Sequence, residues 1–213
     1  GLAGAFGRSR IQRVNFSSHF SGVGNGELDF RAGATDVDAG RGSTDPTEYG
    51  NAARMRYIGA RFAQVNWNTS LDADTDITLM ASHTEMANRD RFPYLNPSPY
   101  YGISINFSAD EYTDILGLQW TRRLTPTLRV VSGKEHQSEL NVSPSGFDAR
   151  EKVGVNFSRL FGNAEWVAHP SVILNAGAMF EHNNISGDSV SPRLMVNWHA
   201  SDNQVVRAGV STA

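Results

Sequence analysis

The sequence has no cysteine among its 213 residues, which excludes disulfide bonds and thiolate metal sites. It has no run of about 20 apolar residues, which argues against a helical membrane protein. Lysine is scarce, since Lys134 and Lys152 are the only two and arginine supplies the rest of the 19 basic residues. The formal net charge is -3 and no basic stripe is present, so we expect no nucleic-acid partner.

Motifs of several enzyme and metal-binding classes are missing or incomplete. Residues 72–76 (DADTD) match the start of a calcium loop, but Ile77 and His83 stand where that loop needs glycine and glutamate. Gly133-Lys134 lacks the rest of a phosphate-binding loop, and neither a G-x-S-x-G elbow nor an H-E-x-x-H helix is present. We therefore predict no metal site, no cofactor and no enzymatic activity.

The sequence does contain a regular series of alternating apolar and polar residues. Val14 and Phe16 share one face with Phe20, while Asn15 and Ser17 share the other, and this period of two predicts β-strands. The predicted strands cover about 10–20, 28–34, 56–69, 77–81, 116–121, 128–138, 151–166, 172–181, 193–199 and 206–210. A slip of one residue would exchange the two faces, so the alternation also fixes the register.

Turns and loops follow these strands in a fixed rhythm. Short turns are predicted at 22–26, 71–76, 124–127, 169–171 and 201–203, where glycine, proline, asparagine and aspartate gather. Longer polar loops are predicted at 36–54, 88–110 and 141–148, with a shorter one at 183–189. Short turns on one side and long loops on the other are typical of transmembrane β-barrels. A mean hydropathy of -0.38 is compatible with that class, because only every second residue faces lipid.

Two further features favour a membrane barrel over a soluble sandwich. The polar strand faces are rich in Asn, Gln, Arg and Glu, which a watery lumen allows and a packed core does not. Trp67, Trp120, Trp166 and Trp198 each stand beside a short turn, as expected for an aromatic girdle at the periplasmic membrane interface. We predict an all-β, antiparallel, up-and-down transmembrane β-barrel of about ten strands that contacts outer-membrane lipid.

Several strand sequences resemble those of TonB-dependent outer-membrane receptors. The segments are residues 159–166 (RLFGNAEW), 191–198 (SPRLMVNW) with 206–211 (VRAGVS), 12–16 (QRVNF) and 62–67 (FAQVNW). They follow one another in the order expected for these barrels, and the similarity is strongest from Phe157 onward.

The resemblance implies a 22-stranded barrel that holds an N-terminal plug domain, in the outer membrane of a Gram-negative bacterium. Such receptors bind ferric siderophores, cobalamin or other nutrients and import them with energy passed on by TonB, which contacts the plug. Residues 1–213 are expected to be one β-barrel segment of such a receptor, without plug domain, TonB box or signal peptide. It would be part of a larger barrel.

One predicted loop is the best candidate for ligand binding. It carries arginines, which suit anionic ligands, and aromatic residues, which stack on flat, catecholate-like groups. Its candidate residues are Arg89, Arg91, Phe92, Tyr94, Tyr100 and Tyr101. Binding residues favour loops carried on a rigid scaffold, so we expect a small-molecule nutrient such as a ferric siderophore to bind here.

Other interpretations remain open from the sequence alone. A small outer-membrane barrel of porin or protease type is one, and Asp110, Asp114, Glu135 and His136 near the loop bases would supply the carboxylate and imidazole groups of a protease. A soluble all-β ligand-binding module is another, and it predicts tryptophans in a core and polar strand faces on the surface.

Overall fold

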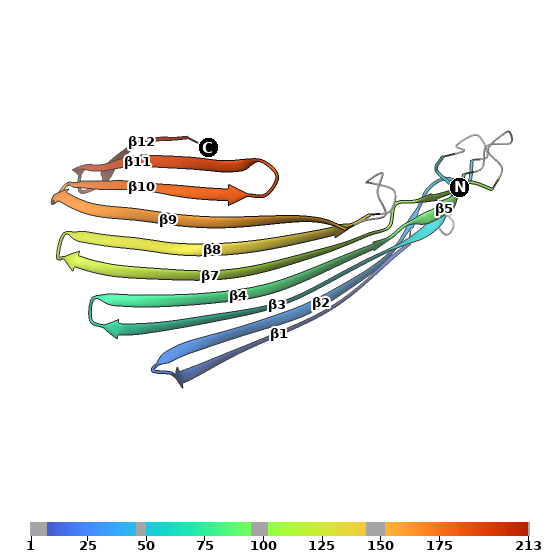
Figure 1. Cartoon of the computed structure of the whole chain (residues 1–213), viewed down its shortest axis with the longest axis horizontal. Helices are drawn as coiled ribbons and strands as arrows, with labels where there is room; N and C mark the ends of the chain where they lie inside the picture. The colour runs from blue at the N-terminus through green and yellow to red at the C-terminus, as the bar shows by residue number, and fades with distance from the viewer. Residues whose placement is uncertain (1–7, 46–49, 95–101, 144–151, 213) are drawn as a thin grey trace.

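A computed structural model of the chain describes residues 8–45, 50–94, 102–143 and 152–212. Ten long strands form one antiparallel sheet, in which each strand pairs with the next long strand along the chain (Figure 1). Their bounds are β1 Ser9–Val23, β2 Gly26–Arg41, β3 Arg54–Asp72, β4 Thr75–Arg89, β7 Ala109–Thr125, β8 Leu128–Val142, β9 Val153–His169, β10 Val172–Asn183, β11 Gly187–Ser201 and β12 Gln204–Ser211. The predicted up-and-down order of ten strands is confirmed.

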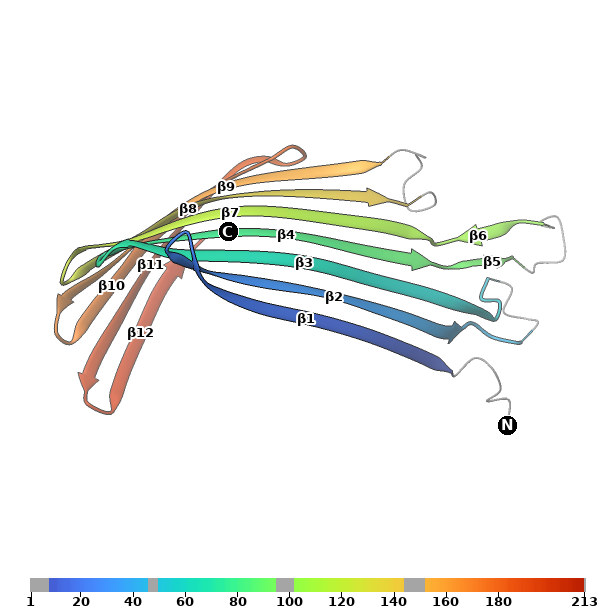
Figure 2. The same cartoon turned by 90° about the horizontal axis from the view of Figure 1, so that it is seen from below.

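The sheet is curved and does not close on itself. Figure 2 shows its bend, with β10, β11 and β12 turned relative to β1 to β4. Strands β1 and β12 lie at the two edges. Within the described part of the chain, no helix is long and apolar enough to cross a membrane.

All five short turns lie at one end of the sheet. The first is a two-residue turn, Gly24-Asn25, with φ angles of 59° and 62°. Two successive positive φ values define the hairpin turn that matches the natural twist of paired strands, and glycine and asparagine adopt them at least cost. The Trp67 indole N–H donates to the Val23 carbonyl at 2.7 Å and holds this turn against β3.

Cross-strand register separates two continuous faces. On the first, Phe16 opposes Ala32 and Phe20 opposes Leu28, and Leu28 in turn opposes Trp67. Trp67, Leu79 and Leu118 continue the same row into β4 and β7. We call this side the apolar face. The other side carries Asn15, Gln64, Gln119, Glu135 and Arg159, and we call it the polar face. The alternation read from the sequence therefore gives the register correctly.

The strands are longer at the loop end than predicted. The predicted loop 36–54 is wrong over its first third, because β2 continues to Arg41 and pairs there with Arg54 at the start of β3. Similarly, β8 continues to Val142. In the β2 extension the alternation is reversed, because Asp36 and Asp38 lie on the apolar face and Val37 and Ala39 lie on the polar face. The β8 extension keeps the alternation, with Leu140 and Val142 on the apolar face. In addition to the backbone pairing there, the Tyr57 hydroxyl of β3 donates to the Asp36 carboxylate of β2.

The predicted loop 88–110 also contains regular structure. A small two-stranded sheet pairs β5 (Arg91–Pro93) with β6 (Ser104–Asn106), and Phe92 opposes Ile105. The loop thus begins and ends as a narrow hairpin above β4 and β7. The loop predicted at 183–189 is shorter than expected, since β10 ends at Asn183 and β11 begins at Gly187.

Candidate functional site

The middle of the polar face carries a network of charged side chains. Arg159 on β9 donates from Nε to a Glu181 carboxylate oxygen and from Nη1 to Glu135, each at 2.6 Å. The same Nη1 atom donates to the Gln137 side-chain oxygen at 2.8 Å. The guanidinium also lies 4.9 Å from the centre of the Phe157 ring. Arg159 thus joins β8, β9 and β10. The sequence showed only that an arginine stands on a polar strand face and did not identify its partners.

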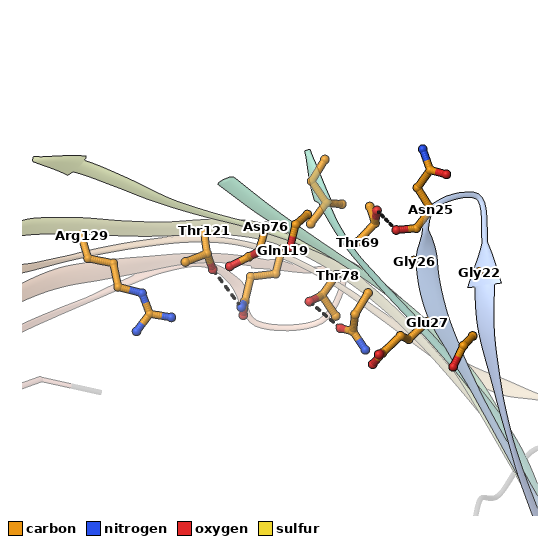
Figure 3. Close-up of a pocket in the computed structure, with 14 residues that line it drawn as sticks. Gly22, Asn25, Gly26, Glu27, Thr69, Asp76, Thr78, Gln119, Thr121 and Arg129 are labelled. Carbon is orange, nitrogen blue, oxygen red and sulfur yellow. Dashed lines mark hydrogen bonds between the residues drawn. The ribbon is translucent and has the colours of Figure 1, made fainter. Parts of the chain in front are cut away.

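The same face is hollowed near the short turns (Figure 3). The hollow has a volume of about 790 Å³ and is lined mainly by polar side chains. Figure 3 shows Thr78 and Gln119 among them; Thr78 donates to Asn68 at 2.8 Å, and Gln119 to Thr121 at 3.4 Å. Glu27 and Arg129 lie at its two sides. A hollow with a mainly polar lining is compatible with contact to water or to another polar surface.

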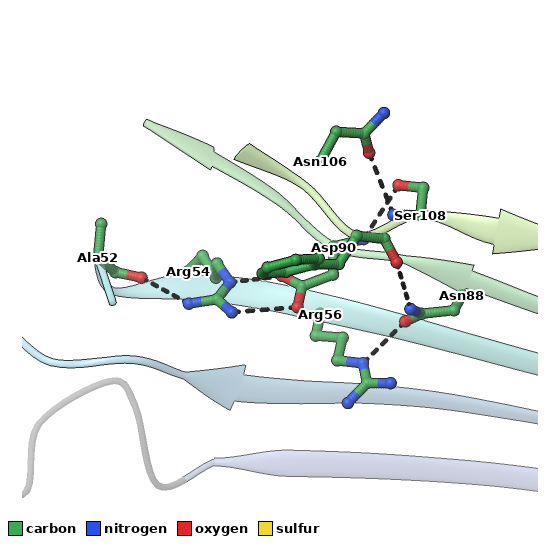
Figure 4. Close-up of polar contacts among 8 residues, drawn as sticks. Ala52, Arg54, Arg56, Asn88, Asp90, Asn106 and Ser108 are labelled. Atoms are coloured by element: carbon green, nitrogen blue, oxygen red, sulfur yellow. Dashed lines mark hydrogen bonds and ion pairs between the residues drawn. The ribbon is translucent and has the colours of Figure 1, made fainter. Parts of the chain in front are cut away.

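The loop end contains the most buried ion pair of the described residues. Arg54 at the start of β3 holds Asp90 with two hydrogen bonds: Nε donates to Oδ1, and Nη2 donates to Oδ2 at 3.0 Å (Figure 4). The third guanidinium nitrogen donates to the Ala52 carbonyl at 3.0 Å. Asp90 is only 6 % exposed. The pair therefore fastens the chain that follows β4 onto β3.

Electrostatics of this pair follow from its geometry. The Arg54 guanidinium stabilises the ionised carboxylate and lowers the pKa of Asp90, against an opposing effect of burial. The backbone N–H of Asp90 donates to Ser108 at 3.2 Å, and the Phe107 N–H donates to the Asp90 carbonyl at 2.7 Å. Asp90 is thus bonded through its side chain to β3 and through its backbone to the chain that leads into β7.

A small apolar core lies beside the Arg54–Asp90 ion pair. The Arg54 guanidinium lies 3.6 Å from the centre of the Phe92 ring, and the Phe92 and Phe107 rings are 5.9 Å apart. Phe92 is only 3 % exposed. Beside it, Arg56 donates to the Asn88 side chain at 2.8 Å, and Asn88 donates to the Phe107 carbonyl at 2.7 Å (Figure 4). A cation stacked on an aromatic ring and shielded from water contributes about 2 kcal/mol.

The predicted ligand-binding residues occupy different surroundings in this loop. Arg89 is half-exposed and forms an ion pair with Asp110 at 2.6 Å. Arg91 donates from Nε to Ser104 across the small hairpin at 3.0 Å. The Tyr94 N–H donates to the Ile103 carbonyl at 2.9 Å. Tyr100 and Tyr101 lie outside the described residues. Burial of Phe92 leaves little of its ring available to a ligand.

The four tryptophans lie at the turn end, where the sequence placed them. Trp166 opposes Leu174 and Leu128, and Trp198 opposes Val172 and Val206, all on the apolar face. Trp166 is 50 % exposed and Trp198 is 49 % exposed. Among the described residues, no second long-stranded sheet packs on this face, although the sandwich interpretation requires one.

The four residues of the protease interpretation do not meet. Glu135 lies on the polar face and is bound by Arg159. His136 and Asp114 lie on the apolar face, where Asp114 accepts from His83 at 2.6 Å, and Asp110 is paired with Arg89. No acid–base pair is formed from these four side chains among the described residues.

Sequence reasoning missed Arg54 and Asp90. Both were placed inside or beside a long loop, and nothing in their local spacing indicates that they meet, because they are 36 positions apart. The available signal was indirect. Arg54 precedes the predicted strand 56–69, and Asp90 follows the predicted strand 77–81. These two strands pair with each other, so the two side chains meet once both strands are extended to their observed ends.

Comparison with known families matches nearly the whole chain. A family model described as TonB dependent receptor-like, beta-barrel matches residues 4–213. Comparison with curated protein sequences gives no match.

Several solved structures have a similar fold. The siderophore receptor PirA from Pseudomonas aeruginosa superposes with a TM-score of 0.74 at 14 % identity, over 95 % of this chain and 33 % of that one. The ferric enterobactin receptor PfeA (G324V) from the same organism gives 0.77 at 13 %, over 98 % and 34 %. The ferric yersiniabactin uptake receptor FyuA from Yersinia pestis gives 0.66 at 12 %, over 94 % and 37 %. The chain spans about a third of the length of these structures.

Proposed function

The chain belongs to the TonB dependent receptor-like β-barrel family, and from this membership we propose that it forms part of the wall of an outer-membrane receptor that binds and imports a ferric siderophore. The structural relatives are a siderophore receptor and receptors for ferric enterobactin and ferric yersiniabactin, which supports this ligand class. The bacterial outer membrane would be its location. TonB would act on it through a plug domain of the full-length protein.

One observation supports the proposal most directly. The loop between β4 and β7 is fixed to the sheet by Arg54 and Asp90, so the arginines and tyrosines that it carries start from a rigid base. A preorganised loop loses less conformational entropy when a ligand binds. Nutrient recognition at the loop end of a barrel needs such a base, because the long loops are otherwise the most mobile part of the fold.

The proposed roles follow from the surroundings of each residue. Arg91 and Arg89 would attract an anionic ferric chelate, while Tyr94, Tyr100 and Tyr101 would stack on its flat groups. Phe92 would contribute by holding Arg54 in place beneath them. The polar face, including the network around Arg159, would form the wetted wall past which the ligand moves.

The first test is ligand binding by the full-length receptor, measured by quenching of intrinsic fluorescence. We expect ferric enterobactin, used as the probe, to bind and the double variant Arg91→Ala, Tyr94→Ala to bind it about tenfold more weakly, since two contacts of about 0.7 kcal/mol each correspond to one factor of ten. Arg123→Ala at the opposite, turn end is the matched control and should bind like the unmodified receptor. Equal binding by both variants would overturn the loop assignment.

A second comparison tests the ligand class itself. A panel of ferric catecholate and ferric hydroxamate chelates should support iron-limited growth of a strain that has this receptor as its only iron uptake route. Growth on none of them would reject siderophore import and leave another nutrient as cargo.

A further inference from the structure

Three arginines gather on the polar face where β2 ends and β3 begins. Arg41 is the last residue of β2 and lies directly opposite Arg54, and Arg56 follows on the same face, opposite Ala39. The three side chains share the face of Gln64, because the pairing of β2 with β3 is regular over this whole length. Arginine is not deprotonated in proteins, so three positive charges stand together here.

A single carboxylate lies among these three charges. Asp90 is bound by Arg54 through two hydrogen bonds. From the row of Gln64 to the loop end, the polar face of β2, β3 and β4 carries no aspartate or glutamate. Asp36 and Asp38 of β2 lie on the opposite face. The charges of two arginines therefore remain without a carboxylate on these strands.

The other two arginines have few contacts. The Arg56 Nε donates to the neutral Asn88 side chain at 2.8 Å, whereas Arg54 is directed at Asp90 (Figure 4). Arg41 is exposed and forms no hydrogen bond or ion pair with any residue that the structure describes. The pKa of Asp90 is lowered by the hydrogen bonds from Arg54 first, and then also by the charges of Arg56 and Arg41. Both arginines thus lie within electrostatic reach of the same carboxylate.

This arrangement is unfavourable for the protein alone. Like charges directly opposite each other on one face of an antiparallel pair are destabilising, and Arg41 and Arg54 are such a pair. Exceptions to the local rules of folding are expected at functional sites. A guanidinium group binds anionic oxygen atoms with two parallel hydrogen bonds, so an anion placed here would relieve the repulsion and satisfy the free N–H groups.

Positive charge continues along the polar face on one side of the sheet only. Arg31 and Arg13 lie on this face of β2 and β1, where Arg13 donates to the Thr35 hydroxyl at 3.3 Å. The same face of β7 and β8 carries Glu111 and Glu139 instead. A surface with charges of one sign raises the local concentration of oppositely charged solutes. An anion is therefore attracted to β1, β2 and β3 and not to β7 and β8.

We propose that Arg41 and Arg56 form an anion-binding site on the polar face, which binds the anionic oxygen atoms of the ferric chelate. This inference rests on the proposed function, which makes a ferric chelate the cargo and turns the polar face toward the lumen. It adds a contact on the strands themselves, beside the loop that Arg54 and Asp90 hold in place. Catecholate and carboxylate oxygens share the required chemistry.

Three ferric chelates, titrated against the full-length receptor by fluorescence quenching, separate this site from the proposed function. Ferric enterobactin has anionic catecholate oxygens, ferric citrate has anionic carboxylate oxygens, and ferrichrome is a neutral hydroxamate. We expect an anionic chelate to bind, and its identity gives the kind of oxygen. If only ferrichrome binds, the arginine site is wrong and siderophore import stands. If none of the three binds, the proposed function fails together with the site.

Variants test the two arginines with the anionic chelate that binds. Arg41→Gln and Arg56→Gln should each weaken binding about tenfold, because each removes charge-assisted hydrogen bonds. Arg41→Lys should recover part of the loss, since it keeps the charge. Arg61→Gln is the matched control, because Arg61 belongs to the same strand but lies on the apolar face opposite Ala34. Unchanged binding by the double variant of Arg41 and Arg56 would overturn the proposal.

Two further measurements distinguish a bound anion from a structural role. The association rate of the anionic chelate should fall with added salt, and it should fall less in the double variant. Without ligand, Arg41→Gln should leave the thermal stability unchanged or raise it, because the change removes the repulsion with Arg54. A less stable ligand-free variant would mean that a carboxylate of the receptor itself is the partner of Arg41, and the proposal would then be rejected.

Discussion

At the scale of single residues, Arg54 combines an ion pair, a backbone hydrogen bond and a stacking contact at the loop end. Its guanidinium binds the Asp90 carboxylate and the Ala52 carbonyl and stacks on Phe92. An arginine suits this position because its planar group can form two parallel hydrogen bonds and a stacking contact at the same time. Lysine would supply the charge but not the geometry.

Arg54→Ala should release the small hairpin from the sheet. The change leaves the buried Asp90 carboxylate without its partner, which costs about 3–5 kcal/mol for a buried ion pair. Hydrogen exchange at the Phe107 and Tyr94 amides should become faster, because both are bonded within this hairpin. Asp90→Ala and the double variant complete the cycle, and additive effects of the two changes would show that the pair is not coupled.

Acid should have the same effect on this hairpin. Because Arg54 lowers the pKa of Asp90, the pair stabilises the folded loop fully at pH values above the ordinary carboxyl pKa of about 3.9. The contribution is lost as the pH falls through the lowered pKa of the folded state. Proteolysis of the loop by pepsin, followed from pH 5 downward, should accelerate in that range. Asp90→Asn should remove the pH dependence, and an unchanged profile in that variant would assign it to another group.

At the scale of elements, the hairpin turns determine how closely neighbouring strands approach. A Cβ atom added at Gly26 would lie 2.3 Å from the Asn68 carbonyl oxygen and 2.9 Å from the Thr69 Cβ. Strand β2 can therefore pair with β3 at its first residue only because position 26 has no side chain. By contrast, a Cβ added at Gly162 of β9 meets nothing within 4 Å.

This contrast predicts different effects for the same substitution. Gly26→Ala should destabilise the receptor by about 1–3 kcal/mol, the usual cost of forcing atoms into an occupied space. Gly162→Ala should be close to neutral. The temperature at which the folded band disappears in an unboiled electrophoresis sample measures both. A similar loss for the two variants would mean that strand propensity rather than the close approach decides the outcome.

The sequence predicted the strands better than their ends. The residues from Val14 to Phe20 and from Ala63 to Trp67 alternate because one face of each strand is apolar and the other is polar. This alternation can be read directly from the sequence. Beyond Ala34 the alternation in β2 is reversed, because Asp36 and Asp38 stand on the face that is apolar in the rest of the strand, so the pattern no longer predicts where the strand ends. The hairpin of β5 and β6 was missed for a related reason: it depends on Arg54, which is distant in the sequence.

At the scale of the whole molecule, the two faces of the sheet belong to different environments. The apolar face presents Leu116, Leu160 and Val210 at exposures of 59 % or more, and the polar face holds its charges in networks such as that of Arg159. The fold, the register and the tryptophan positions were predictable from this division.

The tryptophans provide a test of depth. Lipids brominated near the headgroup should quench the fluorescence of Trp166 and Trp198 in the reconstituted receptor more strongly than lipids brominated near the chain end, because these residues are expected at the membrane interface. Variants that keep only one of the two tryptophans resolve the signals. Strongest quenching by deep bromines would contradict the girdle assignment.

The strands differ greatly in length, since β3 has 19 residues and β10 has 12. Seven residues correspond to about 23 Å along the strand direction. Because the turns lie together at one end, the difference falls at the opposite rim, which is high at β3 and low at β10. The polar face therefore extends about 23 Å less far toward the loop end at β10 than at β3, so the sheet shields a solute on that face less at β10 than at β3.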